Sequence, residues 1–193
     1  MLRQRTAVRS RDVHVCPVWF TWVIDNPLRR WLHKPEEIFG QLIKPGFTVV
    51  ELGCGSGPFT IALAQMVGTS GRVIAADLQP AMLAKVQRRV QQAGMQDRVV
   101  LHVCGREHVG LSVRVDFVLA FWMVHEVPNA TALFAELREA LNPHGKLLLV
   151  EPRLHVGRKH FEREVLAALE AKLELLARPM VRLSRAALFE KRS

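Results

Sequence analysis

The residues best suited to holding a charged ligand lie between positions 51 and 57. Glu51 ends an apolar run, and Gly53, Gly55 and Gly57 follow it at alternate positions. Glycine tolerates positive φ and lets the backbone approach a ligand without an intervening Cβ. A carboxylate beside such a loop disfavours a pyrophosphate and attracts a cationic group. The E-x-G-x-G-x-G spacing therefore predicts a site for a positively charged nucleoside, with a tight turn that binds no ligand as the alternative.

The same spacing argues against a dinucleotide site. The dinucleotide fingerprint G-x-G-x-x-G, counted from Gly53, needs its last glycine at position 58. That position is Pro58, and the third glycine comes one residue early. We expect Pro58 near the first helical position, where its missing N–H costs nothing. The helix that follows should then direct its unpaired N–H groups toward the glycine loop.

A second carboxylate, Asp77, ends the next predicted strand, 20 residues after Gly57. Parallel strands end at a common edge of their sheet, so Asp77 should lie beside the glycine loop. An acid there is well placed to accept hydrogen bonds from both ribose hydroxyls. Leu78 follows Asp77 and could flank the base. An ordinary helix-capping role is the alternative for Asp77.

His125 and Glu126 are the titratable pair best placed for proton transfer. They follow the apolar run at residues 115–121, so they should lie above the carboxyl ends of the strands, where such sheets bind ligands. An imidazole has a pKa suited to proton abstraction near neutrality, which makes His125 a candidate general base. Ordering the loop is its alternative role, and Glu151 at the next strand end is a further candidate.

The sequence resembles the class I methyltransferases that use S-adenosylmethionine. Residues 51–57 match their first motif, and Asp77 falls where they bind the ribose. The resemblance runs from about Glu37 to the C-terminus and implies S-adenosylmethionine as the cofactor. Within this superfamily, residues 125–128 and 150–152 look most like the small-molecule branch that includes the ubiquinone/menaquinone-type enzymes. A small-molecule acceptor is therefore expected.

The resemblance also implies which residues contact the cofactor. They are Glu51, Gly53, Cys54, Gly55, Gly57, Asp77, Leu78, Cys104, Gly105 and Phe121. Relatives usually carry Gly-Asp-Ala after the third strand, where the aspartate holds the adenine amino group. This chain has Cys104-Gly105-Arg106 at that point, so we expect backbone groups of Cys104 and Gly105, or the side chain of Glu107, to serve instead.

The acceptor is expected to be covered from the N-terminal side. Residues 16–33 contain three of the four tryptophans, and in many small methyltransferases a helix before the core forms the substrate lid. We therefore divide the chain into an arm and aromatic lid helix at residues 1–33 and a methyltransferase domain at residues 34–193. Trp22, Asn26 and Trp122 are the expected acceptor contacts, and packing on the sheet edge is the alternative for the helix.

The predicted fold is α/β, a Rossmann-like doubly wound sheet of seven strands in the order 3-2-1-4-5-7-6 with an antiparallel last strand. The apolar runs place strands at residues 47–52, 72–76, 99–103, 115–121, 146–150, 173–177 and 181–189. Besides the helix after the glycine loop, helices are predicted at residues 35–43, 81–93, 130–141 and 158–171.

Composition excludes several other classes of protein. No apolar run reaches about 18 residues, so no membrane span is expected, and residues 1–12 lack the apolar core of a signal peptide. The three cysteines (Cys16, Cys54 and Cys104) fit neither a zinc spacing nor an even disulfide framework, which favours the cytoplasm and predicts no metal.

The net charge of +9 leaves two alternative functions open. Lysines and arginines do not alternate with aromatics and tyrosine is absent, so a base-stacking platform is poorly supported. Attraction to nucleic acid or anionic lipid is still compatible with this charge. The alternatives are an RNA methyltransferase that uses the basic surface and a cofactor-binding protein without transferase activity. The sequence indicates neither the methyl acceptor nor the oligomeric state.

Overall fold

A computed structural model describes residues 33–192 and contains one seven-stranded sheet in the order β3-β2-β1-β4-β5-β7-β6. The predicted α/β fold and strand order are confirmed. Strands β1 to β5 are parallel, and β7 runs antiparallel to its neighbours β5 and β6. The strands are β1 (Thr48–Leu52), β2 (Arg72–Asp77), β3 (Val99–Val103), β4 (Val115–Phe121), β5 (Leu141–Pro152), β6 (Glu174–Ala177) and β7 (Ser184–Glu190).

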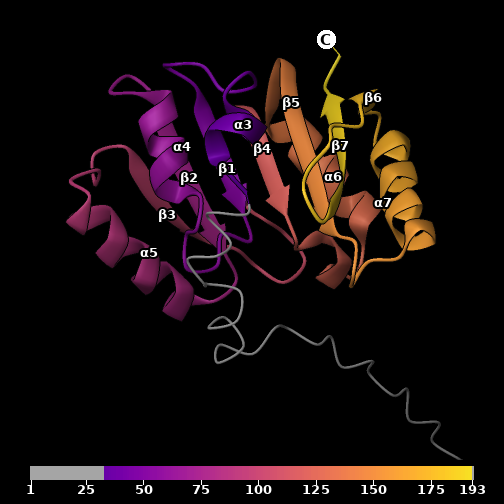
Figure 1. Ribbon diagram of the computed structural model, residues 1–193, viewed down its shortest axis with the longest axis horizontal. Coiled ribbons are helices and arrows are strands. Elements are labelled where there is room, and N and C mark those ends of the chain that lie inside the picture. The colour runs from indigo at the N-terminus through magenta and orange to yellow at the C-terminus, as the bar shows by residue number, and fades with distance from the viewer. Residues whose placement is uncertain (1–32, 193) are drawn as a thin grey trace, which may run out of the picture.

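Helices cover both faces of the sheet (Figure 1). They are α3 (Pro35–Phe39), α4 (Thr60–Val67), α5 (Pro80–Gln92), α6 (Ala130–Ala140) and α7 (Arg158–Glu170), with a 3-10 turn, η1, at Val124–Glu126. Side chains of α3, α4 and α5 share one buried cluster, and those of α6 and α7 share the other. Within the described part of the chain, no helix has the length and apolarity needed to cross a membrane.

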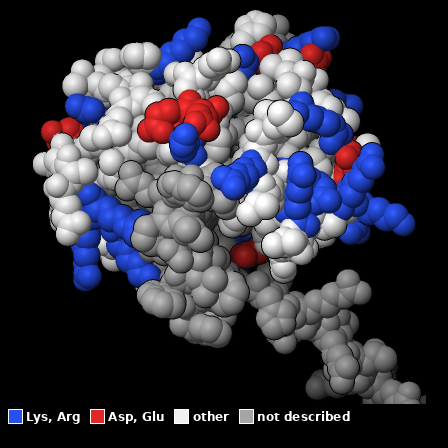
Figure 2. All heavy atoms as spheres, viewed as in Figure 1, with Lys and Arg blue, Asp and Glu red and all other residues white. Residues whose placement is uncertain are grey.

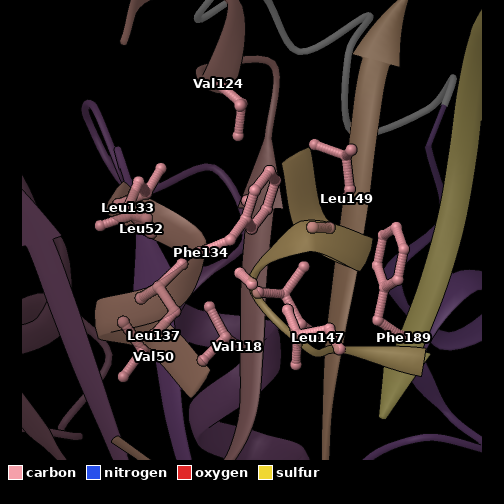
Figure 3. Close-up of a cluster of buried hydrophobic side chains, with 14 of the residues drawn as sticks. Val50, Leu52, Val118, Val124, Leu133, Phe134, Leu137, Leu147, Leu149 and Phe189 are labelled. Atoms are coloured by element: carbon pink, nitrogen blue, oxygen red, sulfur yellow. The ribbon is translucent and has the colours of Figure 1, made fainter. Parts of the chain in front are cut away.

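The two clusters arise because successive residues of a strand point to opposite faces. Val49 packs with the α4 side, whereas its neighbour Val50 packs with the α6 side. Figure 3 shows Phe134 of α6 lying among side chains of β1, β4 and β5, including Val118 and Leu147. Both faces of the central strands are therefore buried, which explains their nearly continuous apolar sequences.

The carboxyl ends of β1 and β4 point toward the lower edge of the sheet in Figure 1. Because β2, β3 and β5 are parallel to them, all five strands end at this edge. The segments that leave these ends contain the glycine loop and Asp77 in one half and His125 and Glu151 in the other. The edge is therefore where the fold brings the predicted site residues together.

Helix α4 begins at Thr60, so Pro58 lies two residues before the helix, near the first helical position as expected. Two other predicted boundaries are wrong. Helix α3 is a single short segment that ends at Phe39 instead of position 43. Strand β5 starts at Leu141, not at position 146, and the pairing of β4 with β5 shifts register there. The extra residues form an irregular, paired segment in which Asn142 Nδ2 donates to Asp116 Oδ1 at 2.7 Å.

Candidate active site

The glycine loop leaves open space at one position only. Gly53, Gly55 and Gly57 have φ values of 63°, 54° and 77°, in the left-handed region. A Cβ at Gly53 would lie 2.9 Å from Met123 Cβ, and one at Gly57 would lie 2.7 Å from Thr60 Oγ1. A Cβ at Gly55 would meet no atom of residues 33–192 within 4 Å. The outer glycines therefore permit close packing, whereas Gly55 borders space that a ligand can occupy.

Asp77 holds the glycine loop in place from the end of β2. Its Oδ2 accepts a hydrogen bond from the Gly55 N–H and its Oδ1 one from the Gln79 N–H, both at 2.8 Å. An ionised carboxylate offers about four acceptor positions, so this one retains capacity for the hydroxyls of a ribose. The open space at Gly55 beside this carboxylate therefore fits the adenosyl cofactor that the resemblance implies.

Glu51 lies beneath the loop and is buried. The hydroxyl of Thr60, the first residue of α4, donates to its Oε2. Burial and then the negative charges of Glu51 and Asp77 raise the pKa of the Cys54 thiol, so the thiol stays neutral. The same two negative charges also favour a cationic ligand. Cys54 itself is buried, and its N–H donates to the Ala76 carbonyl at 3.0 Å.

The predicted adenine side of the site lies beyond β2 and β3. Leu78 is 41% exposed and offers apolar surface next to Asp77. The Cys104 N–H donates to the Asp77 carbonyl and the Gly105 N–H to the His108 carbonyl, both at 2.9 Å. Both amides already donate within the protein. The carbonyl oxygens of Cys104 and Gly105 are therefore the backbone groups suited to accept a hydrogen bond from the adenine amino group. Burial raises the pKa of the Cys104 thiol to about 12.

The exit of β4 is an aromatic turn. Phe121 is buried, with its ring centroid 4.7 Å from that of Phe59 and 5.5 Å from that of Trp122. Trp122 has a φ of 61°, a conformation that costs a non-glycine residue about 1–3 kcal/mol and that clusters at functional sites. Its Nε1–H donates to Ser184 Oγ at 3.0 Å, which attaches this turn to the start of β7.

His125 and Glu151 form a direct pair at the ends of β4 and β5. Glu151 is fully buried and accepts from His125 Nδ1 at 2.7 Å. It also accepts from the N–H groups of Val124 at 2.9 Å and of His125 at 3.3 Å. A carboxylate at Nδ1 requires the proton there, so in the neutral ring Nε2 is the nitrogen that can accept a proton. Nε2 lies 4.0 Å from Glu126 Oε1.

The pKa of His125 reflects opposing effects. Burial favours the neutral ring, but the hydrogen bond to Glu151 and the negative charges of Glu151 and Glu126 outweigh it. The result is a pKa above the ordinary value for histidine. Such a ring holds a proton more strongly than a free imidazole, so it acts as a base only above its raised pKa.

A third carboxyl group lies behind this pair and was not predicted. Glu164 of α7 is buried, and neither of its oxygens accepts a hydrogen bond within residues 33–192. His160 Nε2 lies 3.4 Å from its Oε1. Burial, followed by the charge of Glu151, raises the pKa of Glu164 to about 8, so it is mainly neutral at pH 7.

A sequence signal for Glu164 exists. It shares the buried face of α7 with Phe161, Val165 and Ala168, at helical spacing. An acid on an apolar helix face is the informative exception in such a pattern. His155, whose ring centroid lies 4.9 Å from that of His125, was also not predicted. It lies in the segment between β5 and α7, where no periodic pattern marks it.

The structure brings most predicted residues to one edge and joins the two halves of the site. Met123, two residues before His125, lies against Gly53 of the glycine loop. Trp122 lies beside the start of β7. The acceptor contacts predicted at Trp22 and Asn26 fall outside the described residues, as does nearly all of the predicted arm and lid. The assignments of individual residues to cofactor and acceptor stay predictions.

Comparison with known proteins defines the class. The structure resembles a methyltransferase dependent on S-adenosylmethionine (SAM) from Aquifex aeolicus, with a TM-score of 0.81 at 21% identity, over 91% of this chain and 98% of that one. It also resembles Aeropyrum pernix fibrillarin, solved with bound S-adenosylmethionine, with a TM-score of 0.62 at 16% identity, over 76% and 67% of the two chains. The fold is that of the class I methyltransferases that depend on this cofactor.

The sequence comparison shows the family. Residues 49–145, 97 of the 193, match the methyltransferase domain family, and the chain belongs to it. A demethylmenaquinone methyltransferase of Bacillus velezensis is 27% identical over 123 residues, 64% of this chain and 52% of that protein. One from Lactobacillus johnsonii is 31% identical over 110 residues, 56% of this chain and 45% of that protein. The chain thus spans about half the length of these curated relatives.

Proposed function

We propose that the protein transfers a methyl group from S-adenosylmethionine to a small-molecule acceptor that loses a proton during the reaction. The observation that carries this proposal is the His125–Glu151 pair, whose ring nitrogen and carboxylate lie 2.7 Å apart at the strand ends that adjoin the glycine loop. A buried histidine–carboxylate pair suits proton removal from a hydroxyl. The relatives named for methylation of demethylmenaquinone support a small-molecule acceptor.

When bound, the cofactor supplies a methyl group already activated by the positive charge of its sulfur. Asp77 would hold and orient the cofactor, and the open space at Gly55 would admit it. Glu51 contributes negative charge beneath the loop. Alignment of two bound reactants removes much of the entropic cost of their encounter. The residues of the first half of the site therefore bind and orient, and need not exchange protons.

His125 carries out the proton step in this proposal. Its Nε2 takes the acceptor's proton, and Glu151 keeps the Nδ1–H oriented and stabilises the positive ring that results. Because the pKa of His125 is raised, the rate should increase with pH until the ring is neutral. Glu151 acts through His125 and is a positioning residue.

The test is calorimetry followed by a transfer assay. Purified protein should bind S-adenosylmethionine and its demethylated product, and should methylate members of a panel of hydroxylated aromatic and quinol acceptors, read by mass spectrometry. Binding of a pyridine dinucleotide in place of either nucleoside would refute the cofactor assignment. Methylation of RNA, with a salt-sensitive gel shift and no transfer to small molecules, would refute the acceptor class.

A further inference from the structure

Two loops beside the end of β5 carry the most exposed apolar side chains in the described part of the chain. Leu154, between β5 and α7, is 96% exposed, and Met180, between β6 and β7, is 98% exposed. Leu183, in the second loop, is 51% exposed, within the 39–56% range of the remaining large exposed hydrophobics. Exposed apolar side chains that gather in one place indicate an interaction surface.

The two loops form one surface because hydrogen bonds tie them together. The Arg153 N–H donates to the Leu183 carbonyl at 2.9 Å, and Arg153 Nε donates to the Ser184 carbonyl at 2.8 Å. In the other direction, Arg185 Nη1 donates a hydrogen bond to the Val156 carbonyl at 2.8 Å. Leu154 therefore projects from a loop fixed to the one that carries Leu183 and Met180.

The charge of these loops has one sign. Residues 152–160 and 177–185 contain no Asp or Glu. Their cations are Arg153, Arg158, Lys159, Arg178, Arg182 and Arg185. Arg178 forms a bidentate ion pair with Glu162 of α7, which neutralises its charge. Figure 2 shows Lys and Arg side chains gathered on the flank where Figure 1 places β7 and α7. We define the basic apolar surface as Leu154, Met180 and Leu183 together with the loop cations other than Arg178.

We propose that the basic apolar surface docks the protein on an anionic lipid bilayer. Fully exposed Leu and Met side chains gain free energy by entering the boundary between headgroups and acyl chains. Lysines and arginines near the surface of an anionic leaflet add electrostatic attraction to it. Exposed apolar side chains and cations occur together on one pair of joined loops. An anionic bilayer matches both, because it offers a charged surface above an apolar interior.

The place of this surface in the fold supports the proposal. Pro152, at the end of β5, pairs with Ser184, and Ser184 Oγ accepts from Trp122 Nε1. Trp122 is three residues from His125. The docking surface therefore borders the proposed acceptor side of the active site, so an apolar acceptor dissolved in the bilayer would leave it close to that side. Docking itself requires no methyl transfer, so it stands independently of the proposed function.

Nucleic acid explains the surface less well. Sites for single strands combine cations with aromatic platforms on which bases stack. The two loop segments contain no Phe, Tyr or Trp. Leu154 and Met180 would stay exposed to water on a phosphate backbone, whereas a bilayer covers them.

Vesicle flotation tests the proposal with the full chain. The protein should float with phosphatidylcholine vesicles that contain phosphatidylglycerol, and much less with phosphatidylcholine alone. The double variant Leu154→Gln/Met180→Gln keeps the charge and should reduce the bound fraction at least tenfold. Val113→Gln is the matched control, because Val113 is 47% exposed but precedes β4, at the opposite edge of the sheet. It should float like the wild type.

Three outcomes would overturn the proposal. The first is no flotation of the wild type with either vesicle. The second is equal flotation of the double variant, which would assign binding to the overall charge of +9 alone. The third is loss of RNA gel-shift affinity in the double variant without any vesicle binding. Thermal melting of each variant checks that the fold is kept. A failure of methyl transfer would leave the flotation result unaffected, so the two proposals fail separately.

Discussion

The two halves of the strand-end edge are built from different chemistry. At the ends of β1 and β2, the carboxylates are held by backbone amides and a threonine hydroxyl, and glycines shape the space. At the ends of β4 and β5, side chains face side chains, and burial changes the pKa of His125 and of Glu164. The first half is suited to binding and the second to moving protons.

The two halves should therefore respond differently to substitution. Backbone geometry defines the first half, so a change there alters shape and affinity. Mutual charge and burial define the second half, so a change there alters protonation.

Replacing His125 by alanine should have the largest effect. Loss of a general base should reduce turnover about 100-fold or more. Affinity for S-adenosylmethionine should stay within about twofold, because Asp77 and the glycine loop are untouched. Single-turnover transfer and calorimetry measure the two quantities.

Glu151→Gln is the companion variant, since it keeps a hydrogen-bond acceptor at Nδ1 but removes the charge. The pH–rate profile should move to lower pH, because the charge of Glu151 raises the pKa of His125. Unchanged turnover in His125→Ala would reduce this half of the site to scaffolding.

Gly55→Val should break the binding half. Its Cβ branches would enter the open space, and its φ of 54° adds backbone strain. We expect roughly 100-fold weaker binding of S-adenosylmethionine, about 2.7 kcal/mol. Gly94→Val is the matched control. Gly94 follows the C-terminal end of α5, has a φ of 65°, and, like Gly55, has no atom of the described residues within 4 Å of an added Cβ. If both variants bind the cofactor equally well, the space at Gly55 is not a ligand site.

Asp77→Ala should weaken cofactor affinity at least tenfold, from loss of charge-assisted hydrogen bonds worth about 1.5–3 kcal/mol. Calorimetry measures the effect, and Asp97→Ala, at an exposed carboxylate after α5, is the control. The pH–rate profile should keep its shape, because the proton half is unchanged. Equal affinity of the wild type and Asp77→Ala would show that this acid does not hold the ribose.

The smallest predicted effect concerns stability against pH. The pKa of Glu164 is about 8 in the fold and about 4.3 in an unfolded chain. The folded state therefore binds the proton more tightly, so this contribution is complete below the unfolded pKa and is lost as pH rises through 8.

Between about pH 5.5 and about pH 8, the wild-type Tm should therefore fall roughly 3–8 °C more than that of Glu164→Gln. Differential scanning calorimetry at several pH values measures the difference. Parallel Tm curves for the two proteins would show that the pKa of Glu164 is not raised, so that the side chain behind His125 is ionised at neutral pH.

Local patterns were enough to predict much of the architecture. The strand positions, the glycine loop after β1 and Asp77 at the end of β2 follow from apolar runs and the turn residues between them, which are short-range features. The strand order was implied by the resemblance to the class I methyltransferases, and the structure has that order. The start of β5 was missed because an Asn-Pro-His-Gly segment normally marks a turn. In the structure it is held by strand pairing and by the contact of Asn142 with Asp116, 26 residues away in sequence.

By itself, the sequence determined the strand positions and the place of the glycine loop, because these depend on residues close together along the chain, and its resemblance to known methyltransferases implied the strand order and the family. Only the tertiary structure decided that Glu151 holds His125, that Glu164 is buried behind them, and that Leu154 and Met180 project from tied loops. The His125–Glu151 contact joins residues 26 positions apart, the Arg153–Ser184 contact joins residues 31 positions apart, and no periodicity pairs them. The helical spacing of α7 marks Glu164 as buried but does not indicate what it lies against. Burial and charge at such contacts are properties of the packed chain, so they become visible only once it is folded.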